Sequence, residues 1–531
     1  MRVTNNMIMK NAASNINSTK EIVNKRNKQM TTQKKIDKPS DDPVVAVRSL
    51  RLSTTLSQVT QYYSKNIPDA TKWLEVTETA LINMRDIMAD CRSLTVQGST
   101  DSYNEQDRNT MMTQLQALQS QLFAEGNADY AGRTVFTGYR TDCNLTFTED
   151  EESTKYRIDQ TFTMEDNMEE HRYYAGSVTV PTTETEVATT TDISDIVQTN
   201  YYRIRLNYTL ENSADTINSL TLSNCTSAVE FTSTNDVYDD SSVQTLTSNT
   251  GSTYSVNVYA NQTDWQAAAG GKTVDDYGIV VIKETGEIIF GSEAASELKA
   301  ADASIKIQYD KTGFDEGELR PEYYYNCVKK ADPLDVNVPV TYTKYDSSDN
   351  VINFDIQYMV ATNQTVTINT EASNVFDSSL QRDLGEMVEA IQNTISAHNK
   401  VDTIKSMMSE SQYSSDDDQE YLQLWLDAAQ KEADFYDDNM QKLFSTELGK
   451  IDEYYAKINL GITDLGCKVD SLKLTETRVG DQRETVQDLQ SENDDIDLSQ
   501  IIIDYTAAYT AYQASLQAAG KLGDVTLLNY L

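Results

Sequence analysis

The spacing of apolar residues changes twice along this 531-residue chain, and this change limits the folds open to it. Near both ends, apolar and small residues recur alternately three and four positions apart, which is the period of a helix that packs against another helix. From about residue 131 to residue 370, short β-branched runs stand among Thr, Ser, Asn, Asp and Tyr, which indicates strands. We therefore predict an α+β multidomain fold: long paired N- and C-terminal helices in a helical bundle or coiled coil, with an inserted all-β region in the middle.

These changes of period divide the chain into five predicted segments. Residues 1–38 form an N-terminal helix that is disordered or pairs with the C-terminal helix. Residues 39–140 and 371–492 form the two halves of a helical rod domain, and residues 141–370 form an exposed β-rich insertion between them. Residues 493–531 form the C-terminal helix, which pairs with the first. The pattern leaves open the fold of the insertion and any ligand that it binds.

The two terminal seams contain several polar residues, so neither helix would be stable alone in water. Because their periods match, we expect the helices to pair within one subunit and then to pack against neighbouring subunits. An ordinary helical domain with its ends tucked in is the alternative. The last residues are apolar where free ends are normally polar, which favours burial by a partner. The residues predicted to carry subunit contacts are Met9, Ala12, Ile16, Val23, Met30, Leu498, Ile501, Tyr505, Ala508, Tyr512, Leu527, Leu528, Tyr530 and Leu531.

A short break separates the first seam from the next helix. Pro39 disfavours helix at Lys38. Asp42 is suited to cap a new helix, with Pro43 at the first helical position, where a missing N–H costs nothing. The predicted linker consists of Pro39, Ser40, Asp41, Asp42 and Pro43.

Further seams predict the remaining helices. The helix after the linker extends to about Leu94, and Pro68 either kinks it or splits it. Later helices are expected from about residue 105 to 124, from about 378, and in two stretches between about 419 and 486. Asp497 is expected to cap the final helix.

The charge of the chain excludes one class of partner. The formal net charge is −39, and a protein this acidic repels the phosphate backbone, so we expect no nucleic acid as a partner. Residues 1–52 differ, with eleven Lys and Arg against four acids, a net +7 that leaves −46 for the rest. This basic arm could reach a neighbouring acidic subunit, although a solvated helix face explains the charge equally well. No apolar run is long enough to span a membrane, and no cleavable signal peptide is recognisable, so the protein stays in the cytosol or leaves by another route.

The sequence contains no recognisable catalytic motif. The two histidines, His171 and His398, have no partner at the spacing of a zinc hydrolase, and the elbow motif of serine hydrolases is absent. Five dispersed cysteines fit neither a disulfide framework nor a zinc site, and are expected to be isolated packing residues. The run Tyr323–Tyr325 is expected to be a strand with both faces partly covered. We therefore predict a protein that is not an enzyme and has no cofactor and no metal.

Five segments of the chain form a recognisable set: Met1–Met7, 36–44 with its Pro-Ser-Asp-Asp-Pro, Gly132–Gly138, 509–516 and 527–531. Together they resemble the hook-associated protein 3 family of the bacterial flagellum, within the flagellin superfamily. Gln33 stands where that family commonly has a glycine. The resemblance covers roughly residues 1–140 and 450–531 and leaves 145–370 uncovered.

The resemblance implies a structural role. It implies export in an unfolded state through the flagellar type III channel, without a cleaved signal peptide, to the hook–filament junction outside the cell. It implies termini that are disordered in the monomer and pair as coiled coils in a tubular homo-oligomer, with the linker setting the angle between inner and outer layers. The implied partners are hook-associated protein 1, flagellin and a flagellar export chaperone.

Three alternatives stay open at this point. The chain could be flagellin itself, although the linker and the Met1-Arg2 start favour the junction family. It could be a flagellin-like surface adhesin with a binding function, for a glycan or a surface, in the β insertion. It could also be a cytosolic coiled-coil scaffold. The number of subunits cannot be read from the sequence.

Overall fold

The computed structural model describes residues 5–100, 105–176, 178–188, 197–225, 227–231, 244–268, 272–330, 339–346 and 349–524. The chain forms two compact units. Unit 1 consists of Met1–Lys72, Gln357–Val366 and Lys468–Leu531, and unit 2 consists of Trp73–Ile356 and Thr367–Cys467. Long helices at both ends of the chain and sheets between them confirm the predicted α+β class. The division into five segments stays a prediction.

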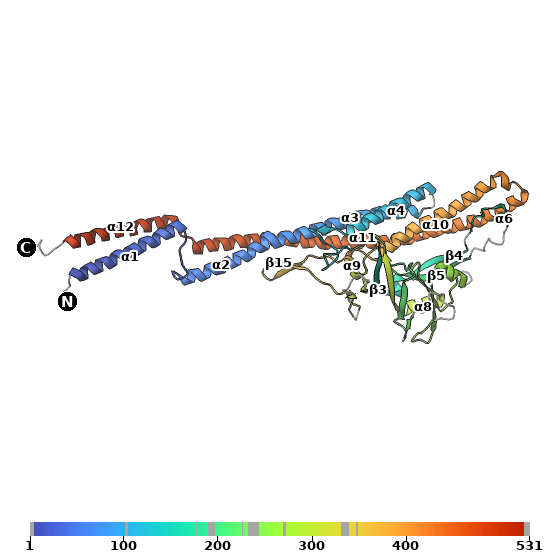
Figure 1. The fold of residues 1–531 in the computed structure, drawn as a ribbon, viewed down its shortest axis with the longest axis horizontal. Helices are drawn as coiled ribbons and strands as arrows, with labels where there is room; N and C mark the ends of the chain where they lie inside the picture. The colour runs from blue at the N-terminus through green and yellow to red at the C-terminus, as the bar shows by residue number, and fades with distance from the viewer. Residues whose placement is uncertain are drawn as a thin grey trace, which may run out of the picture. The chain divides into compact units, whose positions relative to one another are not determined.

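In unit 1, the two terminal helices lie side by side and run antiparallel (Figure 1). They are α1 (Asn5–Thr32) and α12 (Leu498–Asp524). The hydroxyls of Thr19 and Ser515 lie 3.2 Å apart, and Arg26 forms an ion pair with Asp504 at 3.4 Å. The two terminal helices that the sequence predicted to pair therefore contact each other within one chain. Asp497 caps α12 as predicted, because its Oδ1 accepts the backbone N–H groups of Ser499 and Gln500.

The end of α1 and the start of α12 lie next to each other, and the segments that follow and precede them are joined by hydrogen bonds. The backbone N–H of Lys35 donates to the carbonyl of Asp494 at 2.8 Å, and that of Ile496 donates to the carbonyl of Gln33 at 3.0 Å. Gln33 has a φ of 58°, in the left-handed region that favours glycine. The glycine that is common here in the resembling family therefore has a conformational reason.

Pro68 neither splits nor ends the helix that contains it. Helix α2 (Pro43–Gln61) continues through the π-helical turn η1 (Tyr62–Asn66) into α3 (Ile67–Gly98). The backbone N–H of Ile67 donates to the carbonyl of Tyr62, five residues earlier. This wider turn gives room beside the proline ring, which would otherwise clash with a carbonyl in the preceding turn. The short hairpin of β15 (Gln357–Ala361) and β16 (Gln364–Thr367) lies against it, and Asn66 donates to the carbonyl of Met359 at 2.7 Å.

The helices of unit 2 bury the apolar faces that the sequence indicates. The predicted face of Leu380, Leu384, Met387, Ile391 and Ile395 is buried throughout. Two predicted helices between residues 419 and 486 are in fact parts of one helix, α11, because nothing between them breaks the backbone ladder. The elements are α4 (Glu105–Gly126), α9 (Ala372–Val375), α10 (Ser379–Met408), the 3₁₀ turn η4 (Ser411–Tyr413) and α11 (Asp416–Asp494).

The described residues of the inserted region contain two six-stranded sheets. A small hairpin of β1 (Asp129–Tyr130) and β2 (Arg133–Thr134) precedes the insertion. One sheet has the order β4-β5-β11-β10-β9-β8, in which only β9 and β10 pair in parallel. Its strands are β4 (Glu169–Ala175), β5 (Val197–Arg205), β8 (Gln244–Thr247), β9 (Thr253–Tyr259), β10 (Gly278–Ile282) and β11 (Glu287–Phe290). The parallel pair is joined through a helix, as a crossover connection requires.

The other sheet is antiparallel and has the order β14-β13-β3-β12-β6-β7. Its strands are β3 (Glu151–Thr163), β6 (Thr216–Leu222), β7 (Ala228–Glu230), β12 (Ser304–Phe314), β13 (Asn326–Lys330) and β14 (Val340–Tyr342). Short helices that the sequence did not indicate join the strands: α5 (Met164–Asn167), α6 (Glu184–Val187), α7 (Gln262–Ala268), α8 (Ser292–Ala300) and the 3₁₀ turn η3 (Pro321–Tyr323).

The tyrosine run and the cysteines can be compared directly with what the sequence predicted for them. The strand expected at Tyr323–Tyr325 is wrong: Pro321 opens η3, and β13 begins only at Asn326, although all three rings are buried. The five cysteines are unpaired, and Cys91 and Cys327 are buried as packing residues. Within the part of the chain that the structure describes, no helix has the length and apolar character needed to cross a membrane.

The left-handed backbone at Gln33 generates a prediction. Replacing Gln33 by glycine removes the Cβ that opposes this conformation, and we expect α1 and α12 to become more stable by about 1 kcal/mol, less the entropy that glycine loses on folding. Hydrogen exchange of the backbone amides of the two helices measures this local stability. Gln33→Ala keeps the Cβ and should give no gain. Equal protection in both variants would contradict the explanation.

Candidate functional site

Most of the predicted assembly residues in the described part of α1 and α12 are partly buried. Ile501 is buried, and Met9 and Leu498, at the ends of the two lists, are exposed. The remaining described positions are half-buried: Ala12, Ile16, Val23, Met30, Tyr505, Ala508 and Tyr512. Leu527, Leu528, Tyr530 and Leu531 lie outside the described residues. The structure thus brings the two seams together within one chain, while their contact with other subunits stays a prediction.

Two helices alone cannot cover this seam. Of all the described residues of α1 and α12, only Gln29 and Ile501 are buried. A helix pair with small and polar seam residues is marginal in water, since helices gain most of their stability from packing on other elements. The half-exposed seam is therefore a surface that further packing would stabilise.

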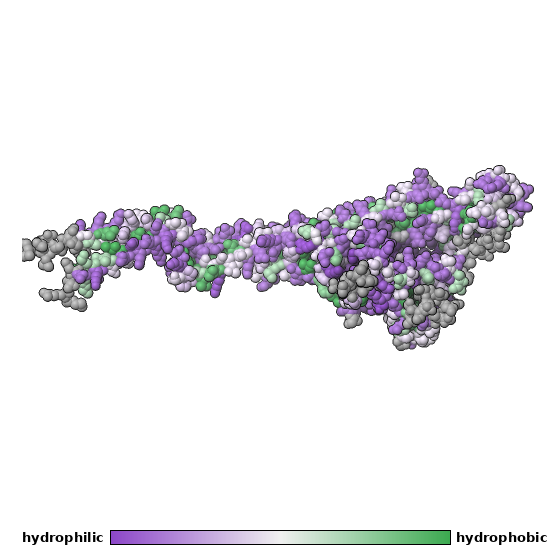
Figure 2. Space-filling model, in the orientation of Figure 1, coloured by the Kyte–Doolittle hydropathy of each residue, from purple (hydrophilic) through white to green (hydrophobic). Residues whose placement is uncertain are grey.

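A second apolar stripe on α12 was missed in the sequence. Ile502, Tyr509 and Leu516 follow one another at intervals of seven, with 48%, 44% and 43% of their surfaces exposed. They lie one position along from the first seam, so they flank it on the same helix. Figure 2 shows apolar residues on the outside of the α1–α12 pair. The seven-residue spacing of these three residues could have revealed the stripe. It was missed because each of them directly follows a residue of the first seam, which dominates the pattern.

The linker is built as its residue types suggest. Asp42 Oδ1 accepts the backbone N–H groups of Val44 and Val45 at 3.0 and 3.2 Å, with Pro43 at the start of α2. Asp41 accepts the N–H groups of Lys38 and Asp37, and these bonds lower the pKa of its carboxyl. Pro39 and Ser40 are exposed. Whether this linker sets an angle between layers stays a prediction.

Unit 2 contains a buried cluster of charges between a sheet and the helices. Arg203 of β5, only 2% exposed, contacts three carboxylates that come from three different elements. Its Nε donates to Glu169 of β4 at 2.9 Å, and its two terminal nitrogens contact Glu287 of β11 and Glu386 of α10. Arg205 also contacts Glu386, at 2.6 Å. This cluster fastens the β4–β5–β11 sheet to α10.

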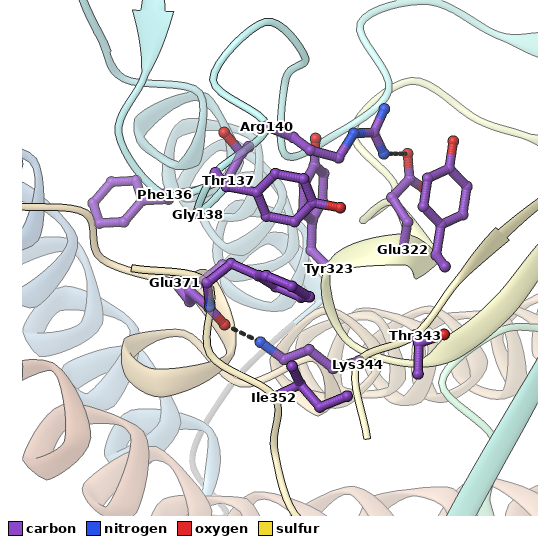
Figure 3. A pocket seen from close by; sticks show the side chains of 14 residues that line it. Phe136, Thr137, Gly138, Arg140, Glu322, Tyr323, Thr343, Lys344, Ile352 and Glu371 are labelled. Carbon is purple, nitrogen blue, oxygen red and sulfur yellow. Dashed lines mark hydrogen bonds and ion pairs between the residues drawn. The ribbon is translucent and has the colours of Figure 1, made fainter. Parts of the chain in front are cut away.

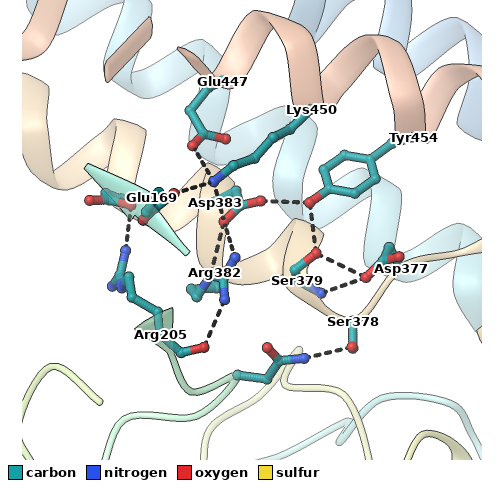
Figure 4. A network of polar contacts seen from close by, with 12 residues as sticks. Glu169, Arg205, Asp377, Ser378, Ser379, Arg382, Asp383, Glu447, Lys450 and Tyr454 are labelled. Carbon is teal, nitrogen blue, oxygen red and sulfur yellow. Dashed lines mark hydrogen bonds and ion pairs between the residues drawn. The ribbon is translucent and has the colours of Figure 1, made fainter. Parts of the chain in front are cut away.

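A second layer of polar contacts extends the cluster to α11 (Figure 4). Lys450 Nζ lies 2.8 Å from both Glu169 and Glu447, and 3.7 Å from Asp383. Asp383 also accepts the hydroxyl of Tyr454 at 2.6 Å. Each cation contacts at least one carboxylate, so the arrangement is suited to hold elements together.

The pKa values in this cluster follow from burial and neighbouring charge. Burial alone would raise the pKa of Glu169, but Arg203 and Lys450 overcome this and hold it at about 2. Burial, reinforced by Arg203, lowers the pKa of His171 to about 4. Burial, reinforced by the carboxylate of Asp383, raises the pKa of Glu447 to about 8. At neutral pH the cluster therefore contains a neutral histidine and a largely protonated glutamate. Within the described ranges, no three His, Cys, Asp or Glu side chains are placed to share a metal ion.

Comparison with known proteins adds the family. Residues 3–141 match the bacterial flagellin N-terminal helical region. Flagellar hook-associated protein 3 of Salmonella typhimurium is 29% identical over 143 residues, and so is the protein of that name from Escherichia coli. The N-terminal region of the chain is therefore similar to that of the flagellins. The resemblance to hook-associated protein 3 that the sequence motifs carried is thereby confirmed. The match spans 27% of this chain and 45% of each relative, so the chain covers less than half the length of these relatives.

Comparison with solved structures adds little to these sequence matches. The crystal structure of hook-associated protein-3 from Legionella pneumophila aligns over 83% of this chain and 97% of its own, with 11% identity and a TM-score of 0.29. A TM-score this low does not establish a shared fold.

The buried arginine Arg203 yields a prediction about stability. Replacing Arg203 by methionine leaves three buried carboxylates without their main cation, and we expect the free energy of unfolding to fall by about 3–5 kcal/mol in urea titrations. The control is Arg92→Met, which breaks a half-exposed ion pair with Asp452 and should change the stability little. Similar losses in both variants would show that burial of the charges does not decide the effect.

Glu447 yields a prediction about pH. Its pKa is near 4.5 in the unfolded chain and about 8 in the folded one. Between these values the unfolded state loses a proton that the folded state keeps, so the free energy of unfolding falls as the pH rises from about 4.5 to about 8. We expect Glu447→Gln, which cannot titrate, to flatten this profile in urea titrations across that range. Glu453→Gln removes an exposed carboxylate from the same helix and should leave the slope unchanged. A wild-type slope in Glu447→Gln would refute the assignment.

Proposed function

We propose that this chain is a structural subunit of the bacterial flagellum. It acts as an adaptor at the hook–filament junction, assembles with copies of itself through its terminal helices, and allows flagellin to polymerise beyond it. The observation that carries the proposal is the likeness of 143 residues of the chain, at 29% identity, to two proteins named flagellar hook-associated protein 3. The chain performs no catalysis in this role.

The state of the terminal helices supports assembly through them. The α1–α12 pair leaves its seam half-exposed and presents a second stripe at Ile502, Tyr509 and Leu516. Two apolar stripes on one helix allow it to pack against more than one neighbour, as a closed tube of subunits requires. The basic arm supports the same geometry, since Arg26 and Lys34 already pair with Asp504 and Asp495 in the acidic C-terminal part.

The proposed partners follow from the resemblance. They are hook-associated protein 1 on the hook side, flagellin on the filament side, and an export chaperone before secretion. The proposed location is the extracellular hook–filament junction, reached through the flagellar type III channel without a cleaved signal peptide. In this arrangement the linker Pro39–Pro43 sets the angle between the inner helices and the outer part of the subunit.

The leading alternative is flagellin itself, which would share the terminal helices. The curated relatives bear the name of the junction protein, and this favours the adaptor. Deletion of the gene separates the two. We expect electron microscopy to show hooks without filaments, together with flagellin shed into the medium. Normal filaments on the deletion strain would contradict the proposal and favour a minor flagellin or a surface accessory role.

The same strain tests the second stripe. Complementation with Ile502→Asp combined with Leu516→Asp places charges on the stripe without touching the first seam, and we expect filaments on fewer than one tenth of the hooks. The matched control, Ala507→Asp with Ala514→Asp, puts the same charges on exposed positions around the helix from the stripe and should restore filaments. Export is checked by measuring each variant in the medium of a hook-only strain. Restored filaments with the stripe variant would remove the stripe from the proposed interface.

A further inference from the structure

Unit 2 contains an open cleft that the junction role does not use. It is lined by the turn at Phe136–Arg140, by η3, by the end of β14 and the residues after it, and by Glu371 at the start of α9 (Figure 3). Its enclosed volume is only about 40 Å³, and the wider hollow of about 440 Å³ is open to solvent, so a ligand would lie in its mouth and stay partly exposed. Gly138 has a φ of 65°, and a side chain there would meet Glu371 at 3.3 Å, so the shape of this wall depends on a glycine.

An ion pair lies at each end of the cleft. Arg140 Nη1 lies 3.2 Å from Glu322 Oε1, and Lys344 contacts Glu371 at the other end. A charged ligand would have to displace one member of a pair that is already matched. A neutral ligand with adjacent hydroxyls can donate to the carboxylate and accept from the cation at the same time. The charges therefore favour a neutral polyhydroxyl ligand.

Two aromatic rings belong to the lining of the cleft. Tyr139 and Phe354 are 53% and 44% exposed, and their ring centroids lie 4.8 Å apart. Large rings exposed together at a cleft are the feature that marks a binding surface, since single exposed apolar residues are ordinary. The face of such a ring packs against the C–H groups of a sugar ring.

The floor of the cleft contains an unused hydrogen-bonding group. The side chain of Tyr323 is 8% exposed, and among the described residues its hydroxyl has no hydrogen-bond partner. The guanidinium of Arg140 lies over the rings of both Tyr323 and Tyr342, at 5.8 and 4.8 Å from their centroids. Buried hydroxyls are normally paired, so this one leaves capacity for a water molecule or a ligand group.

We propose that this cleft is a binding site for a neutral saccharide. One face of a pyranose ring packs on Tyr139 and Phe354, and its hydroxyls bridge the pairs Arg140–Glu322 and Lys344–Glu371. The site is independent of the terminal helices, so it holds whether or not the chain acts at the hook–filament junction.

The test uses the full chain and five probes: the methyl glycosides of glucose, galactose, mannose and N-acetylglucosamine, and the anion glucuronate. Saturation-transfer NMR detects contact, and calorimetry gives the dissociation constant, which we expect on the order of 1 mM for a single sugar ring. At least one neutral glycoside should bind, and more tightly than glucuronate.

The variants locate the binding. Tyr139→Ala with Phe354→Ala should weaken it at least tenfold, and Glu371→Gln should weaken it several-fold because one ion pair is lost. The matched control, Tyr277→Ala, removes an exposed tyrosine elsewhere in unit 2 and should leave the affinity unchanged. Thermal unfolding confirms that each variant is folded. Absence of binding by all probes, tighter binding of glucuronate, or equal binding by the double variant and the control would each overturn the proposal.

Discussion

The antiparallel pairing of α1 with α12 is the interaction on which the ends of this chain depend. Neither seam is apolar enough to hold a helix alone, and among the described residues of the pair only Gln29 and Ile501 are buried. Backbone hydrogen bonds of Lys35 and Ile496 hold together the two connections where α1 ends and α12 begins. The Asp42 cap fixes the start of α2, and the Asp497 cap fixes the start of α12. The caps and backbone bonds determine the register, while the apolar contact that would make it stable is left incomplete.

The features that were predictable from the sequence are those that depend on nearby residues. A heptad seam is visible in the spacing of one segment, and so are a capping aspartate and a proline at a first helical position, which is why α1, α12 and the start of α2 could be placed. The π-helical turn before Pro68 could not be chosen from the sequence, because kinking, splitting and widening all relieve the same clash. The strand expected at Tyr323–Tyr325 is wrong because the expectation relied on the strand propensity of tyrosine. In the structure, Pro321 opens a 3₁₀ turn two residues earlier.

The charged cluster around Arg203 was beyond prediction for a different reason. Its three carboxylates lie 34, 84 and 183 residues away in the chain, and the sequence holds many acidic residues that could have been partners. Only the folded sheet and α10 select these three. The cleft at Tyr139 has the same character, since its walls come from segments about 230 residues apart. Sites assembled from distant segments need the tertiary structure to be seen.

The buried charged cluster of unit 2 and the half-buried seam of the α1–α12 pair differ in how strongly they penalise alternative arrangements of the chain. In unit 2 the ions at the centre of the cluster, Arg203, Glu287 and Glu386, are buried. A wrong packing would leave one of these charges unpaired at a cost of several kcal/mol, and this penalises alternatives to the native arrangement. In the α1–α12 pair, most seam side chains keep contact with water, so alternative arrangements cost little. If the pair assembles as proposed, neighbouring subunits supply the burial that a single chain lacks, and the order of the terminal helices depends on the concentration of assembled partners. The proposed adaptor between two tubes requires both properties: a body whose own contacts specify its structure, and terminal helices that neighbouring subunits stabilise.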